Sequence, residues 1–322
     1  MPRRWRLGAV GFRYRHRRAV VRQQEAVVGI SRGLRVGMVV AIWSALAVTG
    51  CSSDQSSGPP CVPPVKTAKV DDIANLLPDN VKQAGKLVVG VDATYPPNEF
   101  KDKDGNVIGF DVDLLSAVAA PLGVTLDCRV SAFDKIIPSI GKTYDMGMSS
   151  LTDNKEREAQ VDFVDYFNAG TLWAQRPGAP IDPNNACGKK VAVQTGTIQA
   201  DELTTKNDAC VKASKPAIDI VKFDAQDAAN NAVTLGQVDA MTADYPVTAY
   251  AIKNSAGKLE AAGEQFETAP YGWAVEKGSK LGPALLKSLE HITQTGEYNQ
   301  ILAKWGVEKG AIGKPGINGA VS

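Results

Sequence analysis

Three segments of the sequence contain residues that could together hold a small charged molecule. Arg157 follows a run of small hydroxyl residues, and its planar guanidinium suits bidentate binding of a carboxylate. Val193–Gln199 passes through Gly196 into a helical stretch, where free backbone N–H groups suit an anion. Asp244 follows an apolar run and could receive an ammonium group. Together these groups outline a site for an α-carboxylate and an α-ammonium, as in a free amino acid.

Each of these segments also has a simpler interpretation. Arg157 could be a solvated arginine among acidic neighbours, the glycine could be only a turn, and Asp244 could cap a helix that Pro246 begins. The glycine count is too low for a dinucleotide fingerprint, and no P-loop lysine follows. In a further segment, Asp92–Pro97, the prolines favour an extended loop that would present the flat ring of Tyr95 as a wall of the site. Tyr95 could equally belong to the core.

The elements that must position these residues alternate between short apolar runs and amphipathic stretches. Strands are predicted at residues 86–91, 125–130, 144–148, 189–193, 218–223 and 238–242. Helices are predicted at residues 111–122, 134–140, 198–206, 226–235, 281–293 and 298–305. This alternation favours parallel α/β sheets, and the pattern restarts near residue 189. The part of the chain after Cys51 is also near the length at which a single hydrophobic core stops growing and two lobes are favoured. The sequence therefore predicts two α/β lobes with a cleft between them.

The charge of the 322 residues is divided sharply at Cys51. Residues 1–50 contain ten arginines and one acid, whereas the remaining 272 residues carry 26 bases and 34 acids, a net charge of −8. An acidic body is a poor partner for nucleic acid. Only two histidines are present, which argues against histidine-based zinc sites and most pairs of nucleophile and base. We therefore expect no metal, no cofactor and no nucleic-acid partner.

The N-terminal region resembles an export signal. Val36–Val48 is an apolar run preceded by arginines, and it is shorter than the roughly 20 residues that a membrane span needs. Val48–Cys51 resembles a bacterial lipobox, in which Cys51 is lipidated, although an ordinary signal peptide is the alternative. The basic stretch before it is long, so translation could start downstream. The polar, proline-containing stretch after Cys51 is typical of a tether. We expect an exported protein, lipid-anchored to the outer face of the cell membrane.

Four cysteines remain once Cys51 is assigned to lipid, and export permits disulfides. Four cysteines allow three connectivities. Cys187 and Cys210 are close in sequence and should lie in the same lobe, so we favour this pair. Cys61 with Cys128 then follows by elimination.

The body resembles the polar amino-acid solute-binding proteins of bacterial ABC importers, which are family 3 of the extracellular solute-binding proteins. The resemblance covers nearly all of residues 80–310, and the order and spacing of its motifs make it specific. The stretches that carry it are Val89–Pro97, Gly109–Leu114, Ile136–Pro138, Ser150–Arg157, Gly196–Thr197 and Asp239–Asp244. It implies a two-lobed periplasmic-binding-protein fold of type II, in which each lobe is a mainly parallel sheet flanked by helices.

The resemblance also implies where the chain crosses between lobes, near residues 170–173 and 268–272. Lobe 1 would comprise residues 80–170 and 271–311, and lobe 2 residues 171–270. The remaining segments would be the signal peptide with its long basic start at 1–50, the lipidated cysteine and tether at 51–79, and a tail at 312–322. A ligand buried between the lobes would be captured by hinge closure and delivered to the permease subunits. We expect the protein to be a monomer.

Carried over residue by residue, the resemblance implies a complete amino-acid site. The ligand carboxylate would contact Arg157, Thr152, Thr197 and Ile198, and the ligand ammonium would contact Ser150 and Asp244. The ligand side chain would lie between Tyr95 and Phe133, and its far end would contact Asp92 and Gln194. An acid at position 92 argues against an acidic ligand, which it would repel. Gln194 departs from the residues that the glutamine and histidine binders of the family carry there. The ligand therefore stays open between glutamine and a basic amino acid.

An enzyme on the same fold is the main alternative, for instance a small-carboxylate dehydratase that resembles cyclohexadienyl dehydratase, because fold does not fix function. Such an enzyme needs an acid or base near the reacting bond. Asp92 and Asp244 are the obvious candidates, and the resemblance gives both of them binding roles. An extracellular sensor is a third reading, but no signalling module follows the body. We expect a binding protein and not an enzyme.

Overall fold

The computed structural model describes Cys61 and residues 68–320, which belong to one compact unit, Ser53–Ser322. The predicted signal peptide, the lipobox with Cys51, and the tether up to residue 67 apart from Cys61 lie outside the described residues, so these assignments stay predictions. Within the part that is described, no helix has both the length and the apolar character to cross a membrane.

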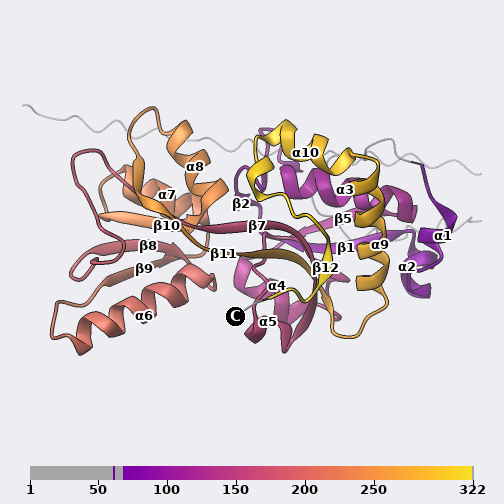
Figure 1. Ribbon diagram of the computed structural model, residues 1–322, viewed down its shortest axis with the longest axis horizontal. Helices are drawn as coiled ribbons and strands as arrows, with labels where there is room; N and C mark the ends of the chain where they lie inside the picture. Colours follow the sequence, from indigo (N-terminus) through magenta and orange to yellow (C-terminus); the bar gives the residue numbers. More distant parts are fainter. Residues whose placement is uncertain (1–60, 62–67, 321–322) are drawn as a thin grey trace, which may run out of the picture. The chain divides into compact units, whose positions relative to one another are not determined.

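One mixed sheet runs through the described body (Figure 1). Its strands follow the order β5-β1-β6-β11-β7-β10-β8-β9, and β12 adds to β7. The bounds are β1 Lys86–Val91, β5 Thr125–Val130, β6 Met146–Gly147, β7 Val161–Gln175, β8 Lys190–Gln194, β9 Asp219–Phe223, β10 Ala240–Asp244, β11 Glu260–Glu276 and β12 Gly316–Ile317. The six predicted strands are all present, with ends that differ by a few residues.

Two long strands join the two parallel groups of this sheet. On one side β1 pairs in parallel with β5 and β6, and on the other β8 pairs in parallel with β9 and β10. Between them β7 and β11 pair antiparallel with each other over most of their length. This arrangement is the two-lobed α/β fold that the sequence predicts. The predicted crossovers fall inside β7 and β11, but their long strand character was not predicted, and the lobe boundaries stay predictions.

Helices flank both parallel groups of the sheet. Their bounds are α1 Asp71–Ala74, α2 Asp79–Ala84, α3 Phe110–Leu122, α4 Phe133–Ser139, α5 Lys155–Glu158, α6 Ile198–Lys212, α7 Gln226–Thr234, α8 Tyr245–Asn254, α9 Leu281–Gln294, α10 Glu297–Trp305 and the 3₁₀ turn η1 Glu308–Gly310. The stripe on α3 packs against α9 and β5, as its spacing predicts. In the other lobe, α7 packs on β8 and α8 packs on β10.

A small antiparallel sheet that was not predicted lies between β1 and α3. It consists of β2 Thr94–Tyr95, β3 Glu99–Lys101 and β4 Val107–Ile108, and it places Glu99 directly opposite Tyr95. Gly109 ends this sheet at a φ of 143°, and a Cβ there would lie 1.9 Å from the carbonyl oxygen of Asn98. Glycine is therefore required for the start of α3 to approach Asn98 and Glu99 so closely.

Two disulfides join Cys61 to Cys128 and Cys187 to Cys210, the pairing that the sequence predicts. The first ties residue 61 to β5, and the second ties the start of β8 to α6. The segment after η1 is also held, because Gly316 and Ile317 pair with Asp165 and Val164 of β7.

Candidate functional site

A cavity between the two lobes brings together most of the predicted ligand residues. Its lining comprises Tyr95, Phe133, Ser150, Thr152, Arg157, Thr197, Ile198, Gln199 and Asp244. Eight of these were predicted, and they come from β2, α4, the loop before α5, α5 itself, the start of α6 with its cap residue, and β10. Residues that are 149 positions apart thus meet in one place, since Tyr95 Oη donates to Asp244 Oδ2 at 2.7 Å.

Arg157 lies where the two lobes approach each other. Asn154 caps the short helix α5 and accepts a hydrogen bond from the Arg157 backbone N–H at 2.8 Å. The guanidinium donates to the carbonyl of Thr152 at 2.9 Å and to the carbonyl of Gly196, in the other lobe, at 3.1 Å. It also lies 5.6 Å from the ring centre of Phe133. Burial lowers the Arg157 pKa, while the charge of Asp244 opposes that shift. A half-buried guanidinium held by two carbonyl groups suits a planar carboxylate.

The start of α6 forms the facing wall of the cavity. Thr197 is the cap residue of this helix, and its hydroxyl accepts from Ala200 N–H at 3.3 Å. The N–H groups of the first helical turn lack helical acceptors and favour negative charge. Gly196 precedes them at a φ of 79°, and a Cβ there would lie 2.8 Å from Asp134 Cβ of the other lobe. A larger residue at position 196 would hold the two walls apart.

Asp244 and Ser150 provide the acceptors of the cavity. Asp244 accepts from Tyr95 at one oxygen and from Gln199 Nε2 at the other, the second at 2.9 Å. Its side chain makes no capping bond to α8, so the capping interpretation is wrong. Burial raises the Asp244 pKa. Ser150 has a φ of 49°, and its hydroxyl bonds to Asn98 and Glu99.

Asp92 and Gln194 lie together but do not line this cavity. Gln194 Nε2 donates to Asp92 Oδ2 at 2.8 Å across the two lobes. The carboxylate also accepts from Phe133 N–H at 3.1 Å and from Thr94 Oγ1 at 2.6 Å. Burial raises the Asp92 pKa. Because Phe133 does line the cavity, this pair stands directly behind one of its walls.

Sequence reasoning missed Gln199, which is almost completely buried and lines the cavity. Its Nε2 donates to Asp244 and to Thr171 Oγ1 of β7, at 2.9 and 3.2 Å. A signal was available, because Gln199 lies in the first turn of the helix predicted from Ile198. Its contact with Asp244 depends on tertiary structure and could not be read from spacing.

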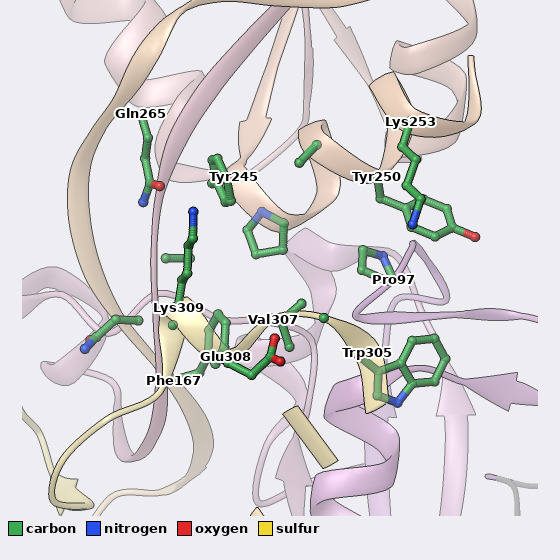
Figure 2. A pocket seen from close by; sticks show the side chains of 16 residues that line it. Pro97, Phe167, Tyr245, Tyr250, Lys253, Gln265, Trp305, Val307, Glu308 and Lys309 are labelled. Carbon is green, nitrogen blue, oxygen red and sulfur yellow. The ribbon is translucent and has the colours of Figure 1, made fainter. Parts of the chain in front are cut away.

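A second cavity is lined by none of the predicted ligand residues (Figure 2). Pro97 and Tyr245, each close in sequence to one member of the bond between Tyr95 and Asp244, line it. One wall presents Tyr250 and Lys253 of α8, and the facing wall includes Trp305 at the end of α10. Phe100 bridges these walls, with its ring centre 6.3 Å from that of Tyr250 and 6.2 Å from that of Trp305.

Two α/β lobes that enclose a polar cavity at their junction define a protein that captures a small ligand. Residues 87–308 match the bacterial extracellular solute-binding proteins, family 3, and the chain belongs to that family. The predicted family is therefore confirmed. The arginine-binding protein ArgT of Corynebacterium glutamicum is 39% identical over 253 residues, which cover 77% of this chain and 83% of that protein.

Solved structures give the same fold. An ancestral arginine-binding protein bound to arginine has a TM-score of 0.64 and 35% sequence identity, covering 69% of this chain and 98% of its own. The ancestral amino acid-binding protein AncCDT-1, a precursor of cyclohexadienyl dehydratase, has a TM-score of 0.62 and 32% identity, covering 72% of this chain and 99% of its own. The similar proteins thus include binding proteins and the precursor of an enzyme.

Proposed function

We propose that this protein captures a polar L-amino acid in the cavity between its lobes and delivers it to the permease subunits of an ABC importer. One observation carries the proposal: Arg157 and the start of α6 line the same small cavity, about 10 Å³ in volume, as the acceptors Ser150 and Asp244. A carboxylate and an ammonium on one carbon match this arrangement of donors and acceptors.

In this proposal the guanidinium of Arg157 turns from the carbonyls of Thr152 and Gly196 toward the ligand carboxylate. The Thr152 hydroxyl and the N–H groups at Thr197 and Ile198 complete the carboxylate site. Ser150 and Asp244 accept from the ammonium. Tyr95 and Phe133 cover the ligand side chain, since both rings line the cavity.

Arginine is the ligand we propose first, with glutamine as the second candidate. Asp92 supports arginine, because a buried carboxylate behind the Phe133 wall can pair with a guanidinium once the side chain reaches it. The amide of Gln194 adds an acceptor oxygen for the same group. In this proposal, a bidentate pair between the ligand guanidinium and Asp92 replaces the bond between Asp92 and Gln194.

Capture would proceed by hinge closure. The lobes are held together by bonds that cross the cleft, from Arg157 to Gly196, Tyr95 to Asp244 and Gln194 to Asp92. A ligand that satisfies these polar groups from within the cleft would stabilise the closed state, with β7 and β11 as the connecting strands. We also propose that Cys51 carries a lipid that holds the exported protein at the outer face of the membrane.

A dehydratase activity is the alternative, and the similarity to AncCDT-1 favours considering it. Asp92 and Asp244 are the acids it would use. Burial raises the pKa of both, but each carboxylate already accepts hydrogen bonds from neighbouring side chains and, in the proposed site, faces a cationic group of the ligand. We therefore propose a binding protein without turnover, which incubation with small cyclic carboxylates and product analysis would test.

The proposed function is tested by thermal melting of the purified protein against each of the twenty L-amino acids. A ligand at 100 times its dissociation constant should add about 2.7 kcal/mol to the free energy of unfolding. We expect arginine to raise the melting temperature and Arg157→Ala to abolish that rise. Arg129→Ala is the matched control, because Arg129 pairs with Asp127 outside the cavity. No shift with any amino acid would contradict the proposal.

A further inference from the structure

Glu99 is a completely buried carboxyl group directly beneath the cavity. It begins β3 opposite Tyr95, and 0% of its surface is exposed. One oxygen, Oε2, accepts a hydrogen bond from the hydroxyl of Ser150 at 2.9 Å. The other, Oε1, has no hydrogen-bond partner among the described residues. A buried acid that is only half satisfied is costly, and such groups are retained where they have a task.

Ser150, which lines the cavity, is held by the protein at its backbone N–H and at its hydroxyl. Its backbone N–H donates to Asp111 Oδ2 at 3.2 Å, and its hydroxyl accepts from Asn98 Nδ2 at 2.8 Å. A serine hydroxyl has one proton and two lone pairs. When the proton is donated to Glu99 and one lone pair is taken by Asn98, only the second lone pair is left for the cavity. In this state Ser150 can accept from an ammonium but cannot donate.

The groups that face Glu99 from the surrounding elements are acids and phenols. They are Asp111 of α3, Asp92 at the end of β1, Asp244 of β10, Tyr95 of β2 and Tyr166 of β7. Burial, and then the charge of Asp111, raise the Glu99 pKa well above its ordinary value. A cation that enters next to Ser150 and Asp244 would favour the ionised form of Glu99.

We infer that Glu99 is a positioning residue for the ammonium half of the site, acting through Ser150. This inference rests on the proposed function and adds to it a group that does not touch the ligand. Ionised Glu99 accepts a hydrogen bond from the Ser150 hydroxyl, which leaves Ser150 to act as an acceptor for the α-ammonium. Because burial favours the protonated form of Glu99 and a neighbouring ammonium favours its ionised form, we expect arginine binding to release protons and arginine affinity to rise with pH.

The test is the variant Glu99→Gln, titrated by calorimetry with L-arginine and with 5-guanidinopentanoate, which is arginine without its α-amino group. We expect the variant to bind arginine at least tenfold more weakly and 5-guanidinopentanoate within twofold of the wild-type value. We also expect the rise of arginine affinity with pH to be lost in the variant. Equal losses for both ligands, or no loss for either, would overturn the role of Glu99.

A second measurement on the wild-type protein needs no variant to fold. Calorimetric titration in two buffers with different ionisation enthalpies gives the number of protons exchanged on binding. Binding of arginine should release more protons than binding of 5-guanidinopentanoate. Equal numbers of released protons for the two ligands would contradict the inference. If arginine does not bind the wild-type protein, the proposed ligand is wrong, and glutamine with 4-carbamoylbutanoate is the pair that tests Glu99.

Discussion

The two ends of the candidate site differ in how their polar groups are held. At the amino-acid end (Ser150, Thr152, Arg157, Thr197 and Asp244), Ser150 and Asp244 are fixed by hydrogen bonds from groups beneath and beside them. At the far end (Asp92 and Gln194), the two side chains bond to each other across the lobes. In the proposed function, the first end would hold the groups that every amino acid shares. The second end would rearrange to admit a side chain, and we propose that it selects one amino acid over another.

Asp244→Asn should have the largest effect, because it removes the charge that the amino-acid end offers to an ammonium. We expect arginine affinity to fall by about 3 kcal/mol, more than a hundredfold. Calorimetric titration measures this loss. Asp239→Asn is the matched control on the same segment, since Asp239 accepts a bond from Lys190 N–H outside the cavity. If Asp244→Asn and the control bind arginine with equal affinity, Asp244 does not bind the ligand ammonium.

Asp92→Asn should change selectivity more than overall binding. The variant keeps the size of the side chain and removes the charge that would pair with a guanidinium. Arginine affinity should fall by about 2 kcal/mol, whereas glutamine affinity should change by less than 1 kcal/mol. Competition titrations with both ligands give the two values. A fall of the same size for both would show that the far end does not select the side chain.

The acids beneath the amino-acid end predict a pH dependence of stability. Burial raises the Asp111 pKa to about 6, whereas an unfolded aspartate titrates near 4. Folding therefore favours the protonated form, and this contribution is present below pH 4 and is lost as pH rises through 6. Asp111→Asn should flatten the fall in the free energy of unfolding between pH 4 and 7, whose slope for one proton is at most about 1.4 kcal/mol per pH unit.

Urea unfolding at several pH values measures this slope, and Asp162→Asn is its control. Although burial opposes it, hydrogen bonds from Asn318 and Gly278 hold the Asp162 pKa below its ordinary value. The stability that Asp162 contributes is therefore lost only as pH falls below 4. If Asp111→Asn leaves the slope of the free energy of unfolding between pH 4 and 7 unchanged, Asp111 is not the source of that slope.

Gln199→Leu should have the smallest effect of the four. The substitution removes one donor to Asp244 while Tyr95 still donates to the same carboxylate. We expect arginine to bind about 1 kcal/mol more weakly, which is roughly fivefold in affinity. The same titration measures it. A loss as large as that of Asp244→Asn would mean that the amino-acid end depends on a single bond and is not held by several.

Much of the fold could be predicted because local patterns and tertiary structure agree. The stripe on α3, for example, and the apolar run of β1 match the predicted elements. The long strands β7 and β11 were missed because their pairing joins residues about a hundred positions apart, and polar residues interrupt the apolar pattern of β11.

The candidate site could be predicted where a residue type itself carries the chemistry. Arg157 and Asp244 have charges that suit a carboxylate and an ammonium, and each follows a predicted strand in the sequence. Glu99 and Gln199 were missed because their meaning comes from contacts with Ser150 and Asp244, which only the folded chain provides. The contact of Asp92 with Gln194 was likewise not foreseen, since it joins the two lobes directly.

A crystal structure of the protein with L-arginine would test the division between the two ends most directly. The account predicts the ligand carboxylate on the Arg157 guanidinium, the ammonium on Ser150 and Asp244, and the guanidinium between Asp92 and Gln194, with the bond between these two opened. A ligand bound in the reverse orientation, or one that leaves the bond between Asp92 and Gln194 intact, would contradict it.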